Sequence, residues 1–145
     1  MSTDCIFCEI AAGRAPAQFV YADEHAFAIL DINPLARGHC LVLPKRHVPY
    51  WHEMTAAETA SVFNAARIVA NRMIEILKCD LVTTYARGRR IPHTHIFLVP
   101  TFGGDLLDRY FNTLERIQES PPDLARLRDP AMMAETARLL KTENR

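Results

Sequence analysis

Four short motifs of this sequence carry side chains that can do chemistry. They are Cys5-x-x-Cys8, Gly38-His39, Pro44-Lys-Arg-His47 and His93-Thr-His95. Thiolates and imidazoles are the ligands that zinc prefers, and an imidazole can also act as a nucleophile or carry a proton. Each motif is weak alone, so their chemistry depends on which of them the fold brings together.

The Cys5-x-x-Cys8 motif allows three interpretations. It can be a pair of buried thiols, a thioredoxin-like redox pair, or one half of a zinc site. A redox pair is expected where a strand leads into a helix, and only four residues precede Cys5 here. A half-site needs two further ligands, which His47 and His93 could supply. Two thiolates and two imidazoles would complete a closed tetrahedral site of the structural kind.

The pair His93 and His95 lies in a segment, Ile91–Pro100, whose composition predicts a strand. Side chains alternate along a strand, so both imidazoles are expected on one face. Burying two imidazoles without partners is costly, and the pair therefore predicts a ligand, a metal or bound water. The alternative is an edge strand with two solvated histidines.

The elements that would position these motifs follow from hydrophobic periodicity. A short helix is expected over residues 5–13, and strands are expected over Gln18–Tyr21, Ala26–Asp31, Cys40–Pro44, Leu81–Tyr85 and Ile91–Pro100. Thr55-Ala-Ala-Glu58 is a capping box, and apolar residues at helical spacing continue from it to about Lys78. This pattern predicts one long amphipathic helix packed on a sheet.

The C-terminal part of the chain predicts two more helices. Phe111–Gln118 is helical in pattern, Ser120-Pro-Pro-Asp123 is a break, and Asp129-Pro130 is a favourable helix start. The fold class is therefore α+β. We expect a single domain over residues 1–145, with a core at about 5–100 and a C-terminal extension at about 101–145.

The charge balance limits the classes of partner. The 145 residues contain 17 Lys and Arg and 17 Asp and Glu, which argues against broad electrostatic binding to nucleic acid or to an anionic membrane. Arg87, Arg89 and Arg90 form a local basic cluster whose default interpretation is solvated surface charge.

The sequence also bears on location. No segment reaches the roughly 18 apolar residues of a membrane-spanning helix, and the N-terminal stretch lacks the basic start of a signal peptide. We therefore expect a cytoplasmic protein whose four cysteines are metal ligands or free thiols.

Taken in order, five blocks of sequence resemble the zinc-containing bacterial branch of the histidine triad (HIT) family. The blocks are Cys5–Gly13, Val20–Asp23, Phe27–Pro34, Gly38–His47 and His93-x-His95. The resemblance spans roughly residues 5–100. It implies a HIT-like fold with a five-stranded antiparallel sheet, one long helix and short terminal helices. It also implies a homodimer in which two sheets join into one continuous ten-stranded sheet, with the helix Thr55–Lys78 helping to form the interface.

The resemblance implies an activity as well. Such proteins are nucleotide hydrolases or nucleotidyl transferases that act at the α-phosphate of a purine nucleotide conjugate, a phosphoramidate or a dinucleoside polyphosphate. His95 takes the place of the family nucleophile, which forms a covalent nucleotidyl-histidine intermediate. His39 would orient or polarise that imidazole.

The resemblance further implies the binding residues. Phe7, Ile10 and Ile32 would line the base pocket, and Asp31 would accept hydrogen bonds from the ribose hydroxyls. Without the family, Phe7 and Ile10 would be ordinary core residues and Asp31 a turn residue. The zinc ligands would be Cys5, Cys8, His47 and His93. Because protein fills all four positions, this zinc would be structural.

Three positions depart from the family pattern. Phe97 stands where the motif has its third histidine, Arg89 replaces a glutamine, and Val82-Thr83-Thr84 replaces an asparagine-glycine pair, while Gly88 keeps its place. If the Arg89 guanidinium supplies the lost donors, the protein remains an enzyme with an altered leaving group or a slower rate. The alternatives are a catalytically impaired nucleotide- or anion-binding zinc protein, and a dimeric scaffold that uses zinc only for stability.

Overall fold

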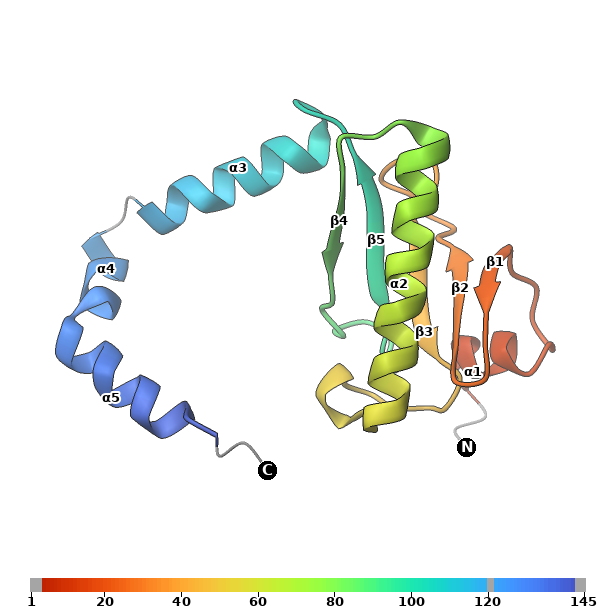
Figure 1. Cartoon of the computed structure of the whole chain (residues 1–145), viewed down its shortest axis with the longest axis horizontal. Helices are drawn as coiled ribbons and strands as arrows, with labels where there is room; N and C mark the ends of the chain where they lie inside the picture. Colours follow the sequence, from red (N-terminus) through yellow and green to blue (C-terminus); the bar gives the residue numbers. More distant parts are fainter. Residues whose placement is uncertain (1–3, 120–121, 143–145) are drawn as a thin grey trace. The chain divides into compact units, whose positions relative to one another are not determined.

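The computed structural model describes residues 4–119 and 122–142. Its centre is one antiparallel five-stranded sheet in the spatial order β1-β2-β3-β5-β4 (Figure 1). The strands are β1 Phe19–Ala22, β2 Ala26–Leu30, β3 Cys40–Pro44, β4 Leu81–Tyr85 and β5 Ile96–Thr101. This confirms the predicted α+β class and sheet.

One face of the sheet is covered by the long helix α2, Ala56–Leu77 (Figure 1). The predicted capping box is present: the Thr55 hydroxyl accepts a hydrogen bond from the Glu58 N–H, and the Glu58 carboxylate accepts one from the Thr55 N–H. Lys78 takes a left-handed conformation and ends the helix. Buried alanines of β2 and α2 line this interface, and their small side chains let helix and sheet approach closely: Ala26, Ala28, Ala65 and Ala66.

The opposite face carries the short helix α1, Ile6–Ala11. Phe7 and Ile10 of α1 are buried against side chains that alternate with the alanines of β2, namely Phe27 and Ile29, and against Leu41 and Leu43 of β3. Strand β2 is therefore apolar on both faces, because helices cover both. This packing brings the cysteines around α1 to the end of the sheet.

Strand β5 begins at Ile96, five residues later than predicted. Pro92 has no N–H to give to a strand ladder. The Thr94 N–H donates instead to the carbonyl oxygen of Val48, over 2.7 Å. His93 and His95 therefore lie in an irregular segment before β5, and the prediction that both stand on a strand is wrong.

The chain divides into two compact units, Met1–Asp105 and Leu106–Arg145. The second contains α3 Leu106–Glu119, α4 Pro122–Ala125, the 3-10 turn η2 Arg126–Arg128 and α5 Pro130–Leu140. Helix α3 starts five residues before its predicted start. Of the predicted break, residues 120 and 121 lie outside the described residues, and Pro122 and Asp123 belong to α4. Helix α5 starts as predicted, with Asp129 accepting a hydrogen bond from the Met132 N–H.

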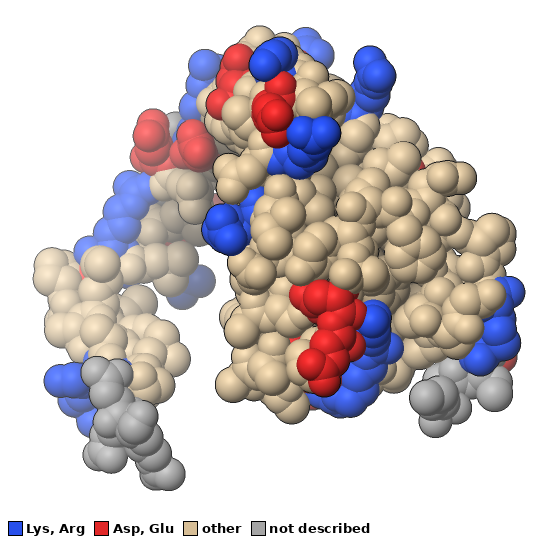
Figure 2. Space-filling view, turned by 45° about the vertical axis from the view of Figure 1, so that its right-hand side comes forward, with Lys and Arg blue, Asp and Glu red and all other residues tan. Residues whose placement is uncertain are grey.

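The surface matches the neutral charge balance. On the face shown in Figure 2, basic and acidic side chains lie together in mixed groups. Uncharged surface lies between these groups. Within residues 4–119 and 122–142, none of the helices has the length and apolar character that a membrane span requires.

Candidate metal centre and active site

Four side chains from separate parts of the chain converge at one end of the sheet. Cys5 and Cys8 come from α1 and its N-cap, His47 follows β3, and His93 precedes β5. Their ligand atoms all lie within 4.8 Å of one another. The Cys5 sulfur is 3.4 Å from His93 Nδ1, and the Cys8 sulfur is 3.3 Å from His47 Nδ1 and 3.6 Å from His93 Nδ1.

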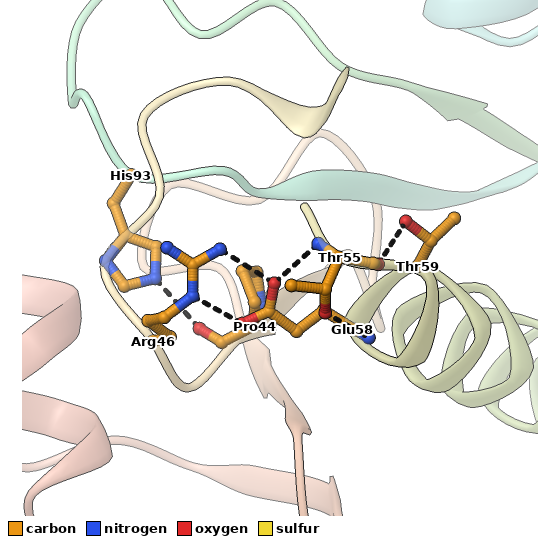
Figure 3. A network of polar contacts seen from close by, with 6 residues as sticks. All are labelled: Pro44, Arg46, Thr55, Glu58, Thr59 and His93. Carbon is orange, nitrogen blue, oxygen red and sulfur yellow. Dashed lines mark hydrogen bonds and ion pairs between the residues drawn. The ribbon is translucent and has the colours of Figure 1, made fainter. Parts of the chain in front are cut away.

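These separations suit zinc. Tetrahedral zinc bonds to sulfur at about 2.3 Å and to nitrogen at about 2.0–2.1 Å place a sulfur and a nitrogen ligand about 3.5 Å apart. His93 Nε2 donates to the carbonyl oxygen of Pro44 over 2.9 Å (Figure 3), which leaves the Nδ1 lone pair facing the sulfur atoms. Burial lowers the pKa of His93 and so favours the neutral ring that binds metal. Burial and the neighbouring Cys5 raise the pKa of the Cys8 thiol to about 11, so a metal ion would have to displace its proton.

An ion pair beside the cluster holds the segment that carries His47. Arg46, the preceding residue, donates two hydrogen bonds to the Glu58 carboxylate, at 2.6 and 2.8 Å (Figure 3). Glu58 also accepts from the Thr55 N–H at the start of α2. The capping box of α2 thus fixes the metal-binding loop as well as the helix.

His95 lies next to this cluster with its ring in a defined orientation. Its Nδ1 donates to the main-chain carbonyl oxygen of His93 over 2.6 Å, since a carbonyl can only accept. In the neutral ring the Nε2 atom therefore carries the lone pair. The ring is 9% exposed and packs 5.3 Å from the ring of Phe7, centre to centre.

A cavity of about 190 Å³ opens beside His95. Thr94, next to His95, also lines it, and the other walls come from the loop and 3-10 turn η1 (Trp51–Glu53) before α2 and from the loop after β4: Tyr50, Trp51, His52 and Arg87. The Thr94 hydroxyl has no hydrogen-bond partner among the described residues. A larger, mostly apolar cavity of about 560 Å³ beside α2 contains none of the residues predicted to bind metal or nucleotide.

The sequence did not point to η1 as part of a site. The only available signal was three ring-bearing residues, Tyr50-Trp51-His52, just before the helix cap. The basic cluster was interpreted as solvated charge, but one of its members, Arg87, lines the cavity. Arg89, predicted to bind the nucleotide, is exposed and is not among the lining residues.

His39 and Asp31 form a second pair at the opposite end of β3. His39 is 2% exposed, and its Nδ1 accepts a hydrogen bond from the Leu35 N–H over 3.1 Å. The proton is therefore on Nε2, which lies 3.6 Å from the Asp31 carboxylate. Burial lowers the pKa of His39, and the Asp31 charge opposes that shift. The Asp31 carboxylate also accepts from the Asn33 N–H.

The ring of Phe97 lies beside both histidines. Its centre is 5.5 Å from the His39 ring and 5.2 Å from the His95 ring, and it stacks on Tyr85 at 4.7 Å. The position of the expected third histidine is thus filled by an aromatic contact. His95 is oriented by the hydrogen bond that it donates to the His93 carbonyl oxygen, and the role of His39 toward His95 stays a prediction.

The remaining predicted binding residues differ in accessibility. Phe7 and Ile10 are each 6% exposed and belong to the core under α1, whereas Ile32 is 92% exposed. The base pocket therefore stays a prediction.

Comparison with known proteins decides the family. A model of the HIT domain matches residues 12–104, more than half of the chain. The chain belongs to the HIT domain family.

Three similar HIT proteins extend this result. An uncharacterised HIT-like protein of Methanocaldococcus jannaschii is 37% identical over 109 residues, 70% of this chain and 81% of the relative. The adenylylsulfatase HINT3 of Arabidopsis thaliana is 32% identical over 74% of this chain, which spans 57% of that relative. A zinc-bound histidine triad family protein from Mycobacterium smegmatis has 33% identity and a TM-score of 0.68, covering 74% of this chain and 81% of its own.

These similarities support zinc at the cluster and show which activities occur in the family. The zinc-bound neighbour has the same fold, and Cys5, Cys8, His47 and His93 form a cluster of the composition that zinc prefers. The HIT family binds nucleotides and includes hydrolases such as the adenylylsulfatase.

Proposed function

We propose that this HIT protein is a nucleotide hydrolase or nucleotidyl transferase that acts at the α-phosphate of a purine nucleotide conjugate, a phosphoramidate or a dinucleoside polyphosphate. The observation that carries the proposal is the hydrogen bond from His95 Nδ1 to the His93 carbonyl oxygen. It leaves the Nε2 lone pair as the nucleophile, beside a cavity that a guanidinium also lines.

The proposed reaction has two displacements. His95 Nε2 attacks the α-phosphorus, the bond to the leaving group breaks, and a nucleotidyl-histidine forms. Water then attacks the same phosphorus and releases the nucleotide and the free imidazole. Arg87 and Arg89 are the cationic groups proposed to neutralise phosphate charge, since a guanidinium can bind two phosphate oxygens at once.

The other proposed roles follow the predicted residues. Asp31 accepts hydrogen bonds from the ribose, Phe7, Ile10 and Ile32 contact the base, and His39 orients or polarises the His95 imidazole. Zinc, held by Cys5, Cys8, His47 and His93, supplies structure alone, because all four positions are occupied by protein ligands. Its effect on chemistry is to fix the main chain of His93, to which His95 is hydrogen bonded.

We also propose a cytoplasmic homodimer that needs neither nucleic acid nor membrane. The described cysteines form no disulfide, and two of them belong to the metal cluster, which suits a reducing compartment. The sheet has two edge strands, β1 and β4, either of which offers unpaired backbone groups for joining two sheets into one.

The deciding experiment is mass spectrometry of protein quenched during turnover of an adenosine phosphoramidate. We expect an added adenylyl mass on the peptide that carries His95, and no addition in His95→Ala, which should keep its fold and zinc content. A matched His25→Gln variant, at the β1–β2 turn, should form the adduct normally.

Two other outcomes would contradict the proposal. Nucleotide binding without adduct or turnover, measured with phosphoramidates and dinucleoside polyphosphates, would identify a catalytically impaired binding protein, the alternative suggested by Phe97. A protein that unfolds on chelation but shows no thermal shift with nucleotides would be a zinc-stabilised scaffold.

A further inference from the structure

The cavity beside His95 contains a second imidazole that the proposed reaction has not yet used. His52 lies in η1, where it is exposed, and its ring contacts the rings of two neighbours. Its ring stacks parallel to Tyr50 with the centres 5.7 Å apart, at an interplanar angle of 5°, and meets Trp51 edge-on at 5.9 Å. Such contacts restrict the orientation of the ring.

The loop that carries His52 also lies against the loop after β4. A side chain added at Gly88 would meet the Tyr50 ring at 3.8 Å, in ordinary van der Waals contact, so the two loops face each other closely. His95 comes from a third segment, the one before β5. His52 and His95 therefore line one cavity from different segments of the chain.

This arrangement matters because displacement at phosphorus places the attacking and leaving atoms roughly in line. A group that protonates the leaving atom must therefore stand on a different wall from the nucleophile. Among the described residues that line the cavity, the ionisable side chains are Tyr50, His52, Arg87 and His95.

Elimination leaves one of the four as the proton donor. His95 is the nucleophile, and its Nδ1 proton is already given to the His93 carbonyl oxygen. A guanidinium does not release its proton in proteins, and a phenol is a weak acid at neutral pH. An imidazole is the side chain that gives and takes a proton near neutrality. Phe97, where the motif has a histidine, has no proton to give.

We propose that the cavity is the leaving-group site and that His52 is the general acid that protonates the departing atom. The inference rests on the proposed function. In the first step the His95 lone pair forms the N–P bond. The electron pair of the breaking bond goes to the leaving nitrogen or oxygen, which takes a proton from the His52 imidazolium. In the second step neutral His52 takes a proton from the attacking water, and the imidazolium is restored.

The size of the cavity restricts the leaving group. About 190 Å³ is below the volume of roughly 300 Å³ or more typical of pockets for drug-sized ligands. It suits a small amine better than a second nucleotide.

The test compares two adenosine substrates that differ only in their need for a proton. An adenosine phosphoramidate of propylamine expels a strongly basic nitrogen, whereas the 4-nitrophenyl ester of AMP expels a stable phenolate. For His52→Gln we expect kcat/KM to fall about 100-fold with the phosphoramidate and by no more than about threefold with the ester. The control His25→Gln, at a half-buried histidine outside the cavity, should leave both rates unchanged.

Each other outcome overturns the inference. Equal losses with both substrates would show that His52 only supports the loop, and no loss with either would show that another group donates the proton. If the wild-type protein turns over neither substrate and forms no adduct, the proposed function itself fails. The wild-type protein could instead turn over the ester and form an adduct on His95, while His52→Gln lowers kcat/KM no more with the phosphoramidate than with the ester. That result would rule out His52 as the general acid but would be consistent with the proposed function.

Discussion

The Nδ1 atom of His95 donates to the main-chain carbonyl oxygen of His93, 2.6 Å away. His93 is at the same time part of the metal cluster through its own Nδ1. One residue therefore connects the zinc site to the ring proposed to attack phosphorus. Loss of the metal should therefore alter the orientation of the His95 ring, even though His95 is not one of the four clustered residues.

Removing one metal ligand tests this connection. Cys8→Ser should lose zinc, lower the melting temperature by about 10 °C or more, and reduce turnover, because His93 would no longer be held. Zinc content by mass spectrometry, thermal denaturation and the phosphoramidate assay measure the three effects. Cys40→Ala, at a buried cysteine outside the cluster, should keep its zinc. Full zinc retention in Cys8→Ser would contradict the assignment.

Asp31→Asn tests the ribose contact. We expect AMP to bind about 10- to 100-fold more weakly, since hydrogen bonds to a charged group are worth about 1.5–3 kcal/mol. The fold should persist, because the asparagine oxygen can still accept from the Asn33 N–H. Calorimetry with AMP and with its 2′,3′-dideoxy analogue distinguishes the loss of a ribose contact from a general loss of nucleotide binding. The variant should lose affinity for AMP but little for the analogue; equal losses would place Asp31 elsewhere than at the ribose.

Phe97→His asks whether the missing histidine limits the rate. Turnover of the propylamine phosphoramidate should rise about tenfold, because a second proton donor would stand beside His39 and His95. In the double variant Phe97→His with His52→Gln, the fall in kcat/KM caused by the His52 change should be smaller than in His52→Gln alone. Loss of the stacking on Tyr85 should lower stability by about 1 kcal/mol. An unchanged or slower rate would show that the phenylalanine is suited to this site.

The ion pair beside the metal loop predicts a pH effect on stability. Hydrogen bonds from Arg46 lower the pKa of the buried Glu58 carboxyl from 4.5 to about 2. A folded-state pKa below the unfolded value adds stability above pH 4.5, and this stability is lost as the pH falls toward 2. Chemical denaturation at pH 7 and pH 3 should show that Glu58→Gln costs about 1–3 kcal/mol at pH 7 and less at pH 3.

A matched control exists on the surface of the same helix. Glu75 pairs with Arg72, but both side chains are about two thirds exposed. Glu75→Gln should change stability by less than about 0.5 kcal/mol at either pH. If Glu58→Gln behaves in the same way, the buried pair does not stabilise the fold through its charge.

Local patterns in the sequence were sufficient for much of the fold. The capping box at Thr55 and Glu58 marked the start of α2 because both groups lie within one helical turn and satisfy each other. Strand β3 was predicted with its observed bounds, since a continuous apolar run between two covered faces has few alternatives. The resemblance also selected four metal-binding residues that the structure brings together.

Tertiary contacts decided the rest. The start of β5 depends on Pro92 and on a hydrogen bond between Thr94 and Val48, which are far apart in the chain. The same holds for the cavity, which His52 before α2, Arg87 after β4 and His95 before β5 line together. The sequence by itself determined the family and the ligand types, because both depend on short motifs whose residues lie close together in the chain. Which arginine and which imidazole share a cavity was settled only by the folded loops, whose positions depend on contacts that no local pattern encodes.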